Sequence, residues 1–129
     1  MKTLVRILSL VIILFAVACS KEGIKGNAAL TGKWAHAGSY MSSGGPQYWV
    51  KATDNKGVTF EDNGNLGGTF FTDYNKYVVK DSVTIKMYAS ADTTKYENYY
   101  YTLKHDTLTV SPREPFMCIE GCSYLFVKK

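Results

Sequence analysis

The chain has 129 residues, of which 15 are basic and 11 acidic, giving a formal net charge of +4. This length fits a single domain. With 46% hydrophobic and 20% charged residues, the composition excludes a disordered polyelectrolyte or a coiled coil rich in Ala, Glu and Lys. The lysines are spread along the chain and form no basic stripe, so we expect no nucleic-acid partner.

The first eighteen residues have the composition of a secretory signal peptide. Lys2 and Arg6 supply a positive start, and the apolar segment that follows ends in small residues. That segment is about a dozen residues long, whereas a membrane-spanning helix needs about 20, so the pattern predicts a cleaved signal. Without Lys2 and Arg6, the charge of the remaining chain falls to 13 − 11 = +2.

Cys19 directly follows Ala16-Val17-Ala18, and this arrangement resembles the lipobox of bacterial lipoproteins. The resemblance implies that residues 1–18 are removed and that acyl chains such as palmitate are attached to Cys19. Several chains give a stable membrane anchor, because each buried CH₂ contributes about 0.8 kcal/mol. Ser20 rather than Asp follows the cysteine. By the same resemblance, this favours the outer membrane, either on its periplasmic face or at the cell surface.

Residues 19–29 are mostly polar and are expected to be a tether, and residues 30–129 are expected to be one all-β domain. Stretches containing Tyr, Val, Thr and Phe recur between Gly, Asn, Asp and Pro, and no helical period is sustained. The predicted strands are residues 33–40, 47–53, 57–61, 65–72, 76–79, 82–90, 95–103, 107–111 and 123–128.

Alternation along these strands predicts which side chains are buried. In residues 82–90, Val83, Ile85 and Met87 are expected to face the core. Asn63-Gly64 predicts a type I′ hairpin, because both residues tolerate positive φ, and residues 112–115 predict a break. Many short antiparallel strands close on themselves because closure removes the exposed edges. The prediction is a small up-and-down antiparallel β-barrel of about eight strands.

Several motifs in order resemble a known family. They are Gly32-Lys33-Trp34, Phe60-Glu61-Asp62-Asn63-Gly64, Asp106-Thr107-Leu108 and Cys118-Ile119-Glu120-Gly121-Cys122. The first resembles the Gly-x-Trp signature of lipocalins, and the set resembles the short lipocalin-like lipoproteins of Gram-negative bacteria. The resemblance implies that Trp34 closes the base of the barrel beneath Lys128, which stands where lipocalins have Arg.

Cys118 and Cys122 are separated by three residues. In an oxidising compartment they favour a disulfide, and Gly121 allows a turn that brings their Cα atoms within reach. Free thiols and a metal or redox site are the alternatives. Two thiols without a nearby His or further Cys cannot fill the four positions around a zinc ion, so we expect no metal and no cofactor.

The two histidines do not predict catalysis. His105 lies in a predicted solvated turn, and His36 alternates with Trp34, so it is expected to point inward and satisfy a hydrogen bond in the core. The chain has no Gly-x-Ser-x-Gly elbow, His-Glu-x-x-His motif or phosphate-binding loop. We therefore expect a protein that is not an enzyme.

Aromatic side chains are predicted on both faces of the barrel wall. The set expected to point inward, as a possible ligand lining, is Tyr48, Phe60, Phe70, Tyr99, Tyr101, Tyr124 and Phe126. The set expected to point outward is Tyr40, Trp49, Phe71, Tyr88, Tyr96 and Tyr100. The inward set predicts either a pocket for a small apolar ligand or a filled interior, and an eight-stranded barrel barely has more room than its own side chains need. The outward set predicts a partner site or cross-strand stacking.

These observations favour a lipid-anchored envelope lipoprotein that binds a small hydrophobic ligand or an envelope protein without catalysing a reaction. One alternative is an inhibitor of lysozyme or a protease, because residues 43–48 faintly resemble the Ser-Gly-x-x-Tyr loop of lysozyme inhibitors. Another is a structural subunit of an outer-membrane complex. The sequence leaves the oligomeric state open.

Overall fold

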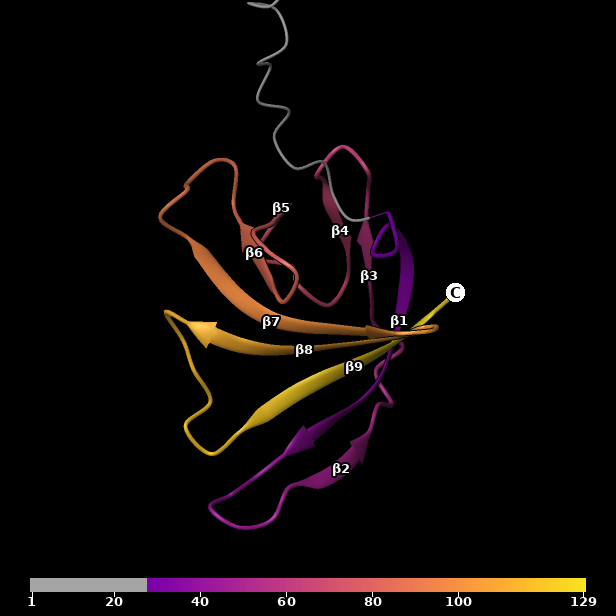
Figure 1. The fold of residues 1–129 in the computed structure, drawn as a ribbon, viewed down its shortest axis with the longest axis vertical. Coiled ribbons are helices and arrows are strands. Elements are labelled where there is room, and N and C mark those ends of the chain that lie inside the picture. Colours follow the sequence, from indigo (N-terminus) through magenta and orange to yellow (C-terminus); the bar gives the residue numbers. More distant parts are fainter. Residues whose placement is uncertain (1–27) are drawn as a thin grey trace, which may run out of the picture.

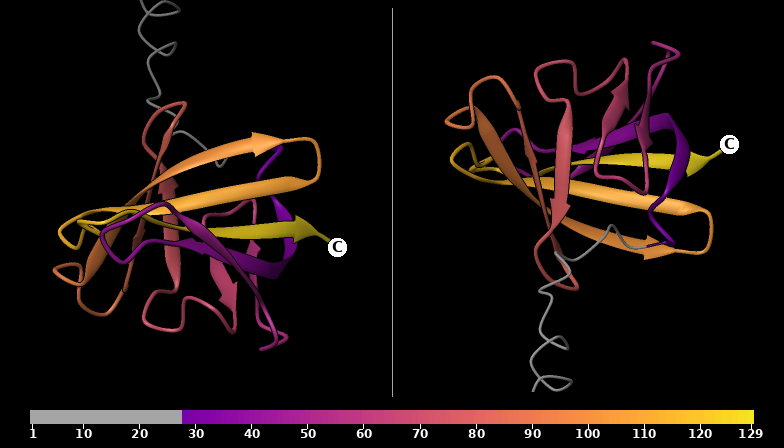
Figure 2. Two further views of the ribbon diagram at one scale, coloured as in Figure 1. Left: turned by 90° about the horizontal axis from the view of Figure 1, so that it is seen from below. Right: turned by 90° about the horizontal axis from the view of Figure 1, so that it is seen from above.

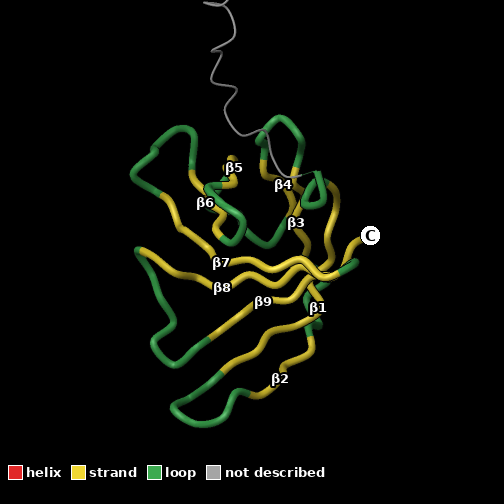
Figure 3. The backbone as a smooth tube through the Cα atoms, in the orientation of Figure 1, coloured by secondary structure: helices red, strands yellow, loops and turns green. Residues whose placement is uncertain are grey.

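The computed structural model describes residues 28–129, and this part of the chain contains nine strands and no helix (Figure 1, Figure 3). The strands are β1 (Gly32–Met41), β2 (Tyr48–Lys51), β3 (Gly57–Phe60), β4 (Leu66–Gly68), β5 (Lys76–Val79), β6 (Thr84–Tyr88), β7 (Tyr96–Lys104), β8 (Thr107–Glu114) and β9 (Cys122–Lys128). Among the described residues, no helix could span a membrane. The predicted signal peptide, Cys19 and most of the tether lie outside the described residues.

The strands form one antiparallel sheet that curls into a nearly closed barrel (Figure 2). Its order is β4-β3-β1-β9-β8-β7-β6-β5, and a bridge between Asn65 and Lys76 links the two ends. Both β2 and β3 pair with β1, β2 along residues 38–41 and β3 along residues 32–35. They therefore share one position in the wall, which leaves eight positions in up-and-down order. The predicted all-β, eight-stranded barrel is confirmed.

The base of the barrel is closed by Trp34, which is 1% exposed. Its Nε1–H donates to the carbonyl oxygen of Leu30 at 2.8 Å. Lys128 pairs with Trp34 across β1 and β9, and its Nζ lies 5.1 Å from the centroid of the indole ring. Gly32 has φ +133°, and a Cβ there would lie 3.2 Å from Lys128 Cε. Gly32, Trp34 and Lys128 therefore lie together at this end of the barrel.

The connection between β4 and β5 packs aromatic side chains against the core. β4 ends at Gly68, although the sequence predicts a strand over residues 65–72. Gly68 has φ +101°, and a Cβ there would lie 2.8 Å from Val58 Cα, so a glycine is needed for this close turn. The chain then carries Phe70 and Phe71 against the core. The prediction that Phe71 points outward is wrong, because strand alternation ends at this turn.

Three local predictions are also corrected. Val83 lies before β6 and is 47% exposed, while Thr84 is buried in its place. The hairpin after β3 is not type I′, because Gly64 alone has positive φ there (88°) and its N–H donates to the Glu61 carbonyl oxygen at 3.1 Å. The predicted break at residues 112–115 is absent, because β8 continues through Pro112, which pairs with Tyr99 at a bulge. Proline has no N–H to donate to a neighbouring strand, and a bulge is a position where a strand tolerates this loss.

Candidate functional site

The predicted inward aromatics lie in the barrel interior with one exception. Phe60, Tyr99, Tyr101 and Phe126 are buried, and Phe70 and Tyr124 pack partly buried against the core. Tyr48 is 53% exposed, so its predicted inward position is wrong. It belongs to β2, whose residues are all exposed because this short strand pairs with β1 alone.

The predicted outward aromatics, apart from Phe71, lie on the outer face. Tyr40, Trp49 and Tyr100 are between 40% and 44% exposed. The Tyr40 and Trp49 rings pack across β1 and β2 in a tilted arrangement, with centroids 5.0 Å apart and ring planes at 55°. This geometry accounts for the pair by cross-strand stacking, which stabilises a two-stranded edge.

The end of the barrel opposite the base contains a cavity of about 320 Å³, which we call the mouth cavity. Most of its lining residues come from the start of β7, the end of β8 and the β8–β9 loop, segments that lie at one side of the sheet in Figure 1. Its lining includes Tyr74, Glu97, Tyr99, Phe116, Met117 and Tyr124. The volume is at the lower end of the range for small-molecule sites, about 300–1,000 Å³. Phe70 and Phe71 thus pack against the core, and a shallow pocket remains at the mouth.

Glu97 is the charged residue in this lining, and it is 2% exposed. It pairs with the buried Met87 across β6 and β7, so it faces inward with Tyr99 and Tyr101. One carboxylate oxygen, Oε2, accepts a hydrogen bond from the backbone N–H of Phe116 at 3.2 Å. The other oxygen, Oε1, is buried and has no hydrogen-bond partner among the described residues. An unpaired buried acceptor is uncommon, because it costs about 1–3 kcal/mol.

The mouth cavity favours neutral hydroxyls and makes the carboxylate costly. Burial raises the pKa of Glu97 above its ordinary value; backbone N–H groups, that of Phe116 first, oppose this rise, and the charge of Glu114 adds to it. Burial also raises the pKa values of Tyr74 and Tyr99, and the negative charge of Glu97 adds to both. Both tyrosines therefore remain protonated at neutral pH and can donate hydrogen bonds.

The β8–β9 loop forms one rim of the mouth cavity. Cys118 and Cys122 lie at disulfide distance, with their Cα atoms 5.7 Å apart, and Gly121 between them has φ 86°. The loop exposes apolar side chains, with Phe116 75% and Ile119 97% exposed. A second cavity of about 430 Å³ lies between this loop and the end of β1. Two apolar hollows thus meet at the same loop.

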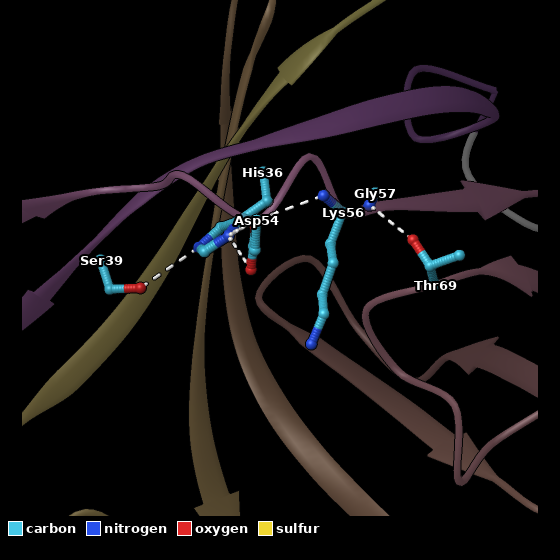
Figure 4. A network of polar contacts seen from close by, with 6 residues as sticks. All are labelled: His36, Ser39, Asp54, Lys56, Gly57 and Thr69. Carbon is cyan, nitrogen blue, oxygen red and sulfur yellow. Dashed lines mark hydrogen bonds and ion pairs between the residues drawn. The ribbon is translucent and has the colours of Figure 1, made fainter.

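A polar network crosses the barrel wall around His36, whose side chain is 8% exposed (Figure 4). Its Nδ1 lies 3.2 Å from Asp54 Oδ1, and its Nε2 lies 3.2 Å from the hydroxyl oxygen of Ser39. A carboxylate can only accept, so Nδ1 carries the proton, and in the neutral ring Nε2 accepts from Ser39. The expectation that His36 points inward and satisfies a hydrogen bond is confirmed, and His105 is exposed in its turn as expected.

This network has the same order of hydrogen bonds as a Ser–His–Asp hydrolase. Ser39 and His36 line neither cavity at the mouth, and the Phe70 ring covers the imidazole with centroids 4.6 Å apart. Desolvation raises the pKa of Asp54, but hydrogen bonds from His36 and from the Lys56 backbone outweigh it and leave that pKa below its ordinary value. The network therefore ties residues 52–56 to β1.

Sequence reasoning missed both Glu97 and the His36 network. Glu97 could have been found, since alternation through Glu97, Tyr99 and Tyr101 places the acid on the inner face. The network could not, because residues three apart on a regular strand face opposite ways. A β-bulge between His36 and Gly38 brings His36 and Ser39 together.

Comparison with protein-family models and with curated proteins found no match for this chain. Within residues 28–129, no group of three or more His, Cys, Asp or Glu side chains is placed to hold a metal ion. The mouth cavity is therefore the candidate functional site, on the evidence of its own geometry.

Proposed function

We propose that this protein is an outer-membrane lipoprotein of the lipocalin-like kind, anchored by acyl chains on Cys19, whose barrel binds a small ligand with an apolar body. The observation that carries the proposal is the mouth cavity of about 320 Å³. Tyrosine rings, Phe116 and Met117 supply its apolar surface, and the protonated hydroxyls of Tyr74 and Tyr99 supply polar contacts. The role is binding, since the site holds a single buried acid and no paired nucleophile and base.

Titration of the full chain with 2-phenylethanol tests this proposal, using calorimetry and NMR shifts of the tyrosine resonances. We expect saturable binding that weakens by several-fold in Phe116→Ser, because this side chain lines the cavity yet is too exposed to support the fold. Ile119→Ser is the matched control, since Ile119 lies in the same loop but lines the other cavity. Equal losses in both variants, or no binding by the parent chain, would contradict the proposal.

The rim of the mouth favours a second candidate, a protein partner or an inhibited enzyme such as lysozyme. Residues 43–48 cover most of the β1–β2 connection and the first residue of β2, and they lie against the β8–β9 loop. A Cβ at Gly44 would lie 3.4 Å from Glu120 Oε1, and a Cβ at Gly121 would lie 2.7 Å from Gln47 Nε2. Together they present Phe116, Met117, Ile119 and Tyr48 to solvent. Inhibition of lysozyme by the parent chain, abolished by Tyr48→Ser, would favour this candidate over a small-ligand binder.

A further inference from the structure

The mouth cavity combines an aromatic lining with one buried carboxylate that is incompletely bonded. Glu97 Oε2 accepts from the Phe116 backbone, whereas Oε1 is unpartnered within residues 28–129. A carboxylate oxygen is an acceptor and has no hydrogen to donate. A ligand group that satisfies Oε1 must therefore bring an N–H or O–H donor.

The charges around the cavity select among such donors. The ionisable groups whose charges act on Glu97 and on the adjacent Tyr74 are Glu114 and Asp73, both acidic. No ion pair within the described residues involves Glu97. Arg113 lies over the ring of the outward Tyr100 at 4.3 Å, and Lys86 lies over Tyr96 at 4.5 Å, so these cations are engaged on the outer face. Among residues 28–129, the lining of the cavity thus contains one acidic residue and no cation.

The aromatic residues favour the same kind of ligand. Tyr74, Tyr99, Tyr124 and Phe116 surround the space beside Glu97. The negative face of an aromatic ring attracts a cation, and this attraction grows when water is excluded. A charge-assisted hydrogen bond to a buried carboxylate is also stronger than a neutral one. Both interactions favour the binding of a protonated amine and disfavour the binding of an anion.

We infer that the mouth cavity binds a small aryl-alkyl or alkyl amine, whose ammonium group is held by the Glu97 carboxylate and the tyrosine rings while its apolar part packs against Tyr99, Phe116 and Met117. This inference depends on the proposed function, because it names the ligand class of the same cavity. A cavity of about 320 Å³ accommodates a molecule of this size but not a long acyl chain.

The experiment compares three probes of matched shape against the full chain by calorimetry at neutral pH: 2-phenylethylammonium, 2-phenylethanol and 3-phenylpropionate. We expect the ammonium to bind about tenfold more tightly than the alcohol, or 1.4 kcal/mol, and the carboxylate to bind more weakly than both. Glu97→Gln keeps an acceptor for the Phe116 N–H but removes the charge. It should bring the ammonium and the alcohol to equal affinity while leaving the affinity for the alcohol within about twofold.

The matched control is Glu114→Gln, a neighbouring acid that bonds Asn98 and does not line the cavity. We expect it to preserve most of the preference for the ammonium. If the parent chain binds the alcohol as tightly as the ammonium, or if Glu97→Gln leaves the preference intact, the amine inference is overturned while the apolar-ligand function stands. If none of the three probes binds, both fail.

Discussion

Removing the indole at the base of the barrel should cost more free energy of unfolding than removing any exposed aromatic ring. Trp34 is 1% exposed and bonds the Leu30 carbonyl oxygen at 2.8 Å. Deleting a buried Trp or Phe typically costs about 3–5 kcal/mol, and an unpaired buried carbonyl adds to this. We expect Trp34→Ala to lose about 4 kcal/mol. That is a large part of the roughly 5–15 kcal/mol that stabilises a domain.

A graded series keeps this prediction measurable if Trp34→Ala does not fold. Trp34→Phe retains a ring but loses the hydrogen bond to Leu30, so we expect a loss of about 1–2 kcal/mol. Lys128→Met retains an apolar stem but removes the charge over the indole, for about 0.5–1 kcal/mol. Urea unfolding followed by far-ultraviolet circular dichroism measures each value. Trp49→Ala, 43% exposed on β2, is the control. If it costs as much as Trp34→Ala, the assignment of Trp34 as the closure of the base is wrong.

Three further predictions concern charge and anchoring. Burial raises the folded pKa of Glu97 above 4.5, so the stabilising contribution of its protonated form is present below that pH and is lost as pH rises through the folded pKa. Glu97→Gln should therefore be more stable than the parent chain at about pH 8 and not at about pH 4, as measured by urea unfolding. The same difference from the parent chain at both pH values would refute this. The folded pKa of Asp54 is lowered below 3.8, so the stabilising contribution of its carboxylate is present above that pH and is lost as pH falls. Asp54→Asn should therefore be less stable than the parent chain at neutral pH and about equally stable at about pH 2. Cys19→Ala should leave the membrane fraction, as judged by fractionation and immunoblotting, and a variant that stays membrane-bound and processed would refute the lipid anchor.

Strand number and barrel closure followed from short-range patterns in the sequence. Alternation of apolar residues is set by the side-chain geometry of a strand, so Ile85, Met87, Tyr99 and Tyr101 were placed on the correct face without knowledge of their partners. Closure followed because a sheet of this length leaves costly edges. Strand alternation and strand number depend on residues close together along the chain, so they can be predicted from a single sequence.

Features that depend on contacts between distant segments were not predictable in this way. The turn at Gly68 depends on the approach of β3, and it moves Phe71 from the expected outer face into the core. Tyr48 alternates like a buried residue, yet β2 pairs with one neighbour and remains outside the closed wall. In both cases the local pattern is sound, and the tertiary arrangement decides the burial.

Glu97 shows why the candidate functional site is the feature that is hardest to predict from strand alternation. The alternation that places Tyr99 and Tyr101 inside also places Glu97 inside, but a buried acid conflicts with the rule that inward positions are apolar. At the base, the buried indole N–H of Trp34 is satisfied by a hydrogen bond; at the mouth, Glu97 Oε1 is not. Local rules describe the parts of a fold where every interaction favours the native state, and a site that must bind something else departs from them. The conflict at Glu97 is therefore the feature to expect at the ligand site that we propose.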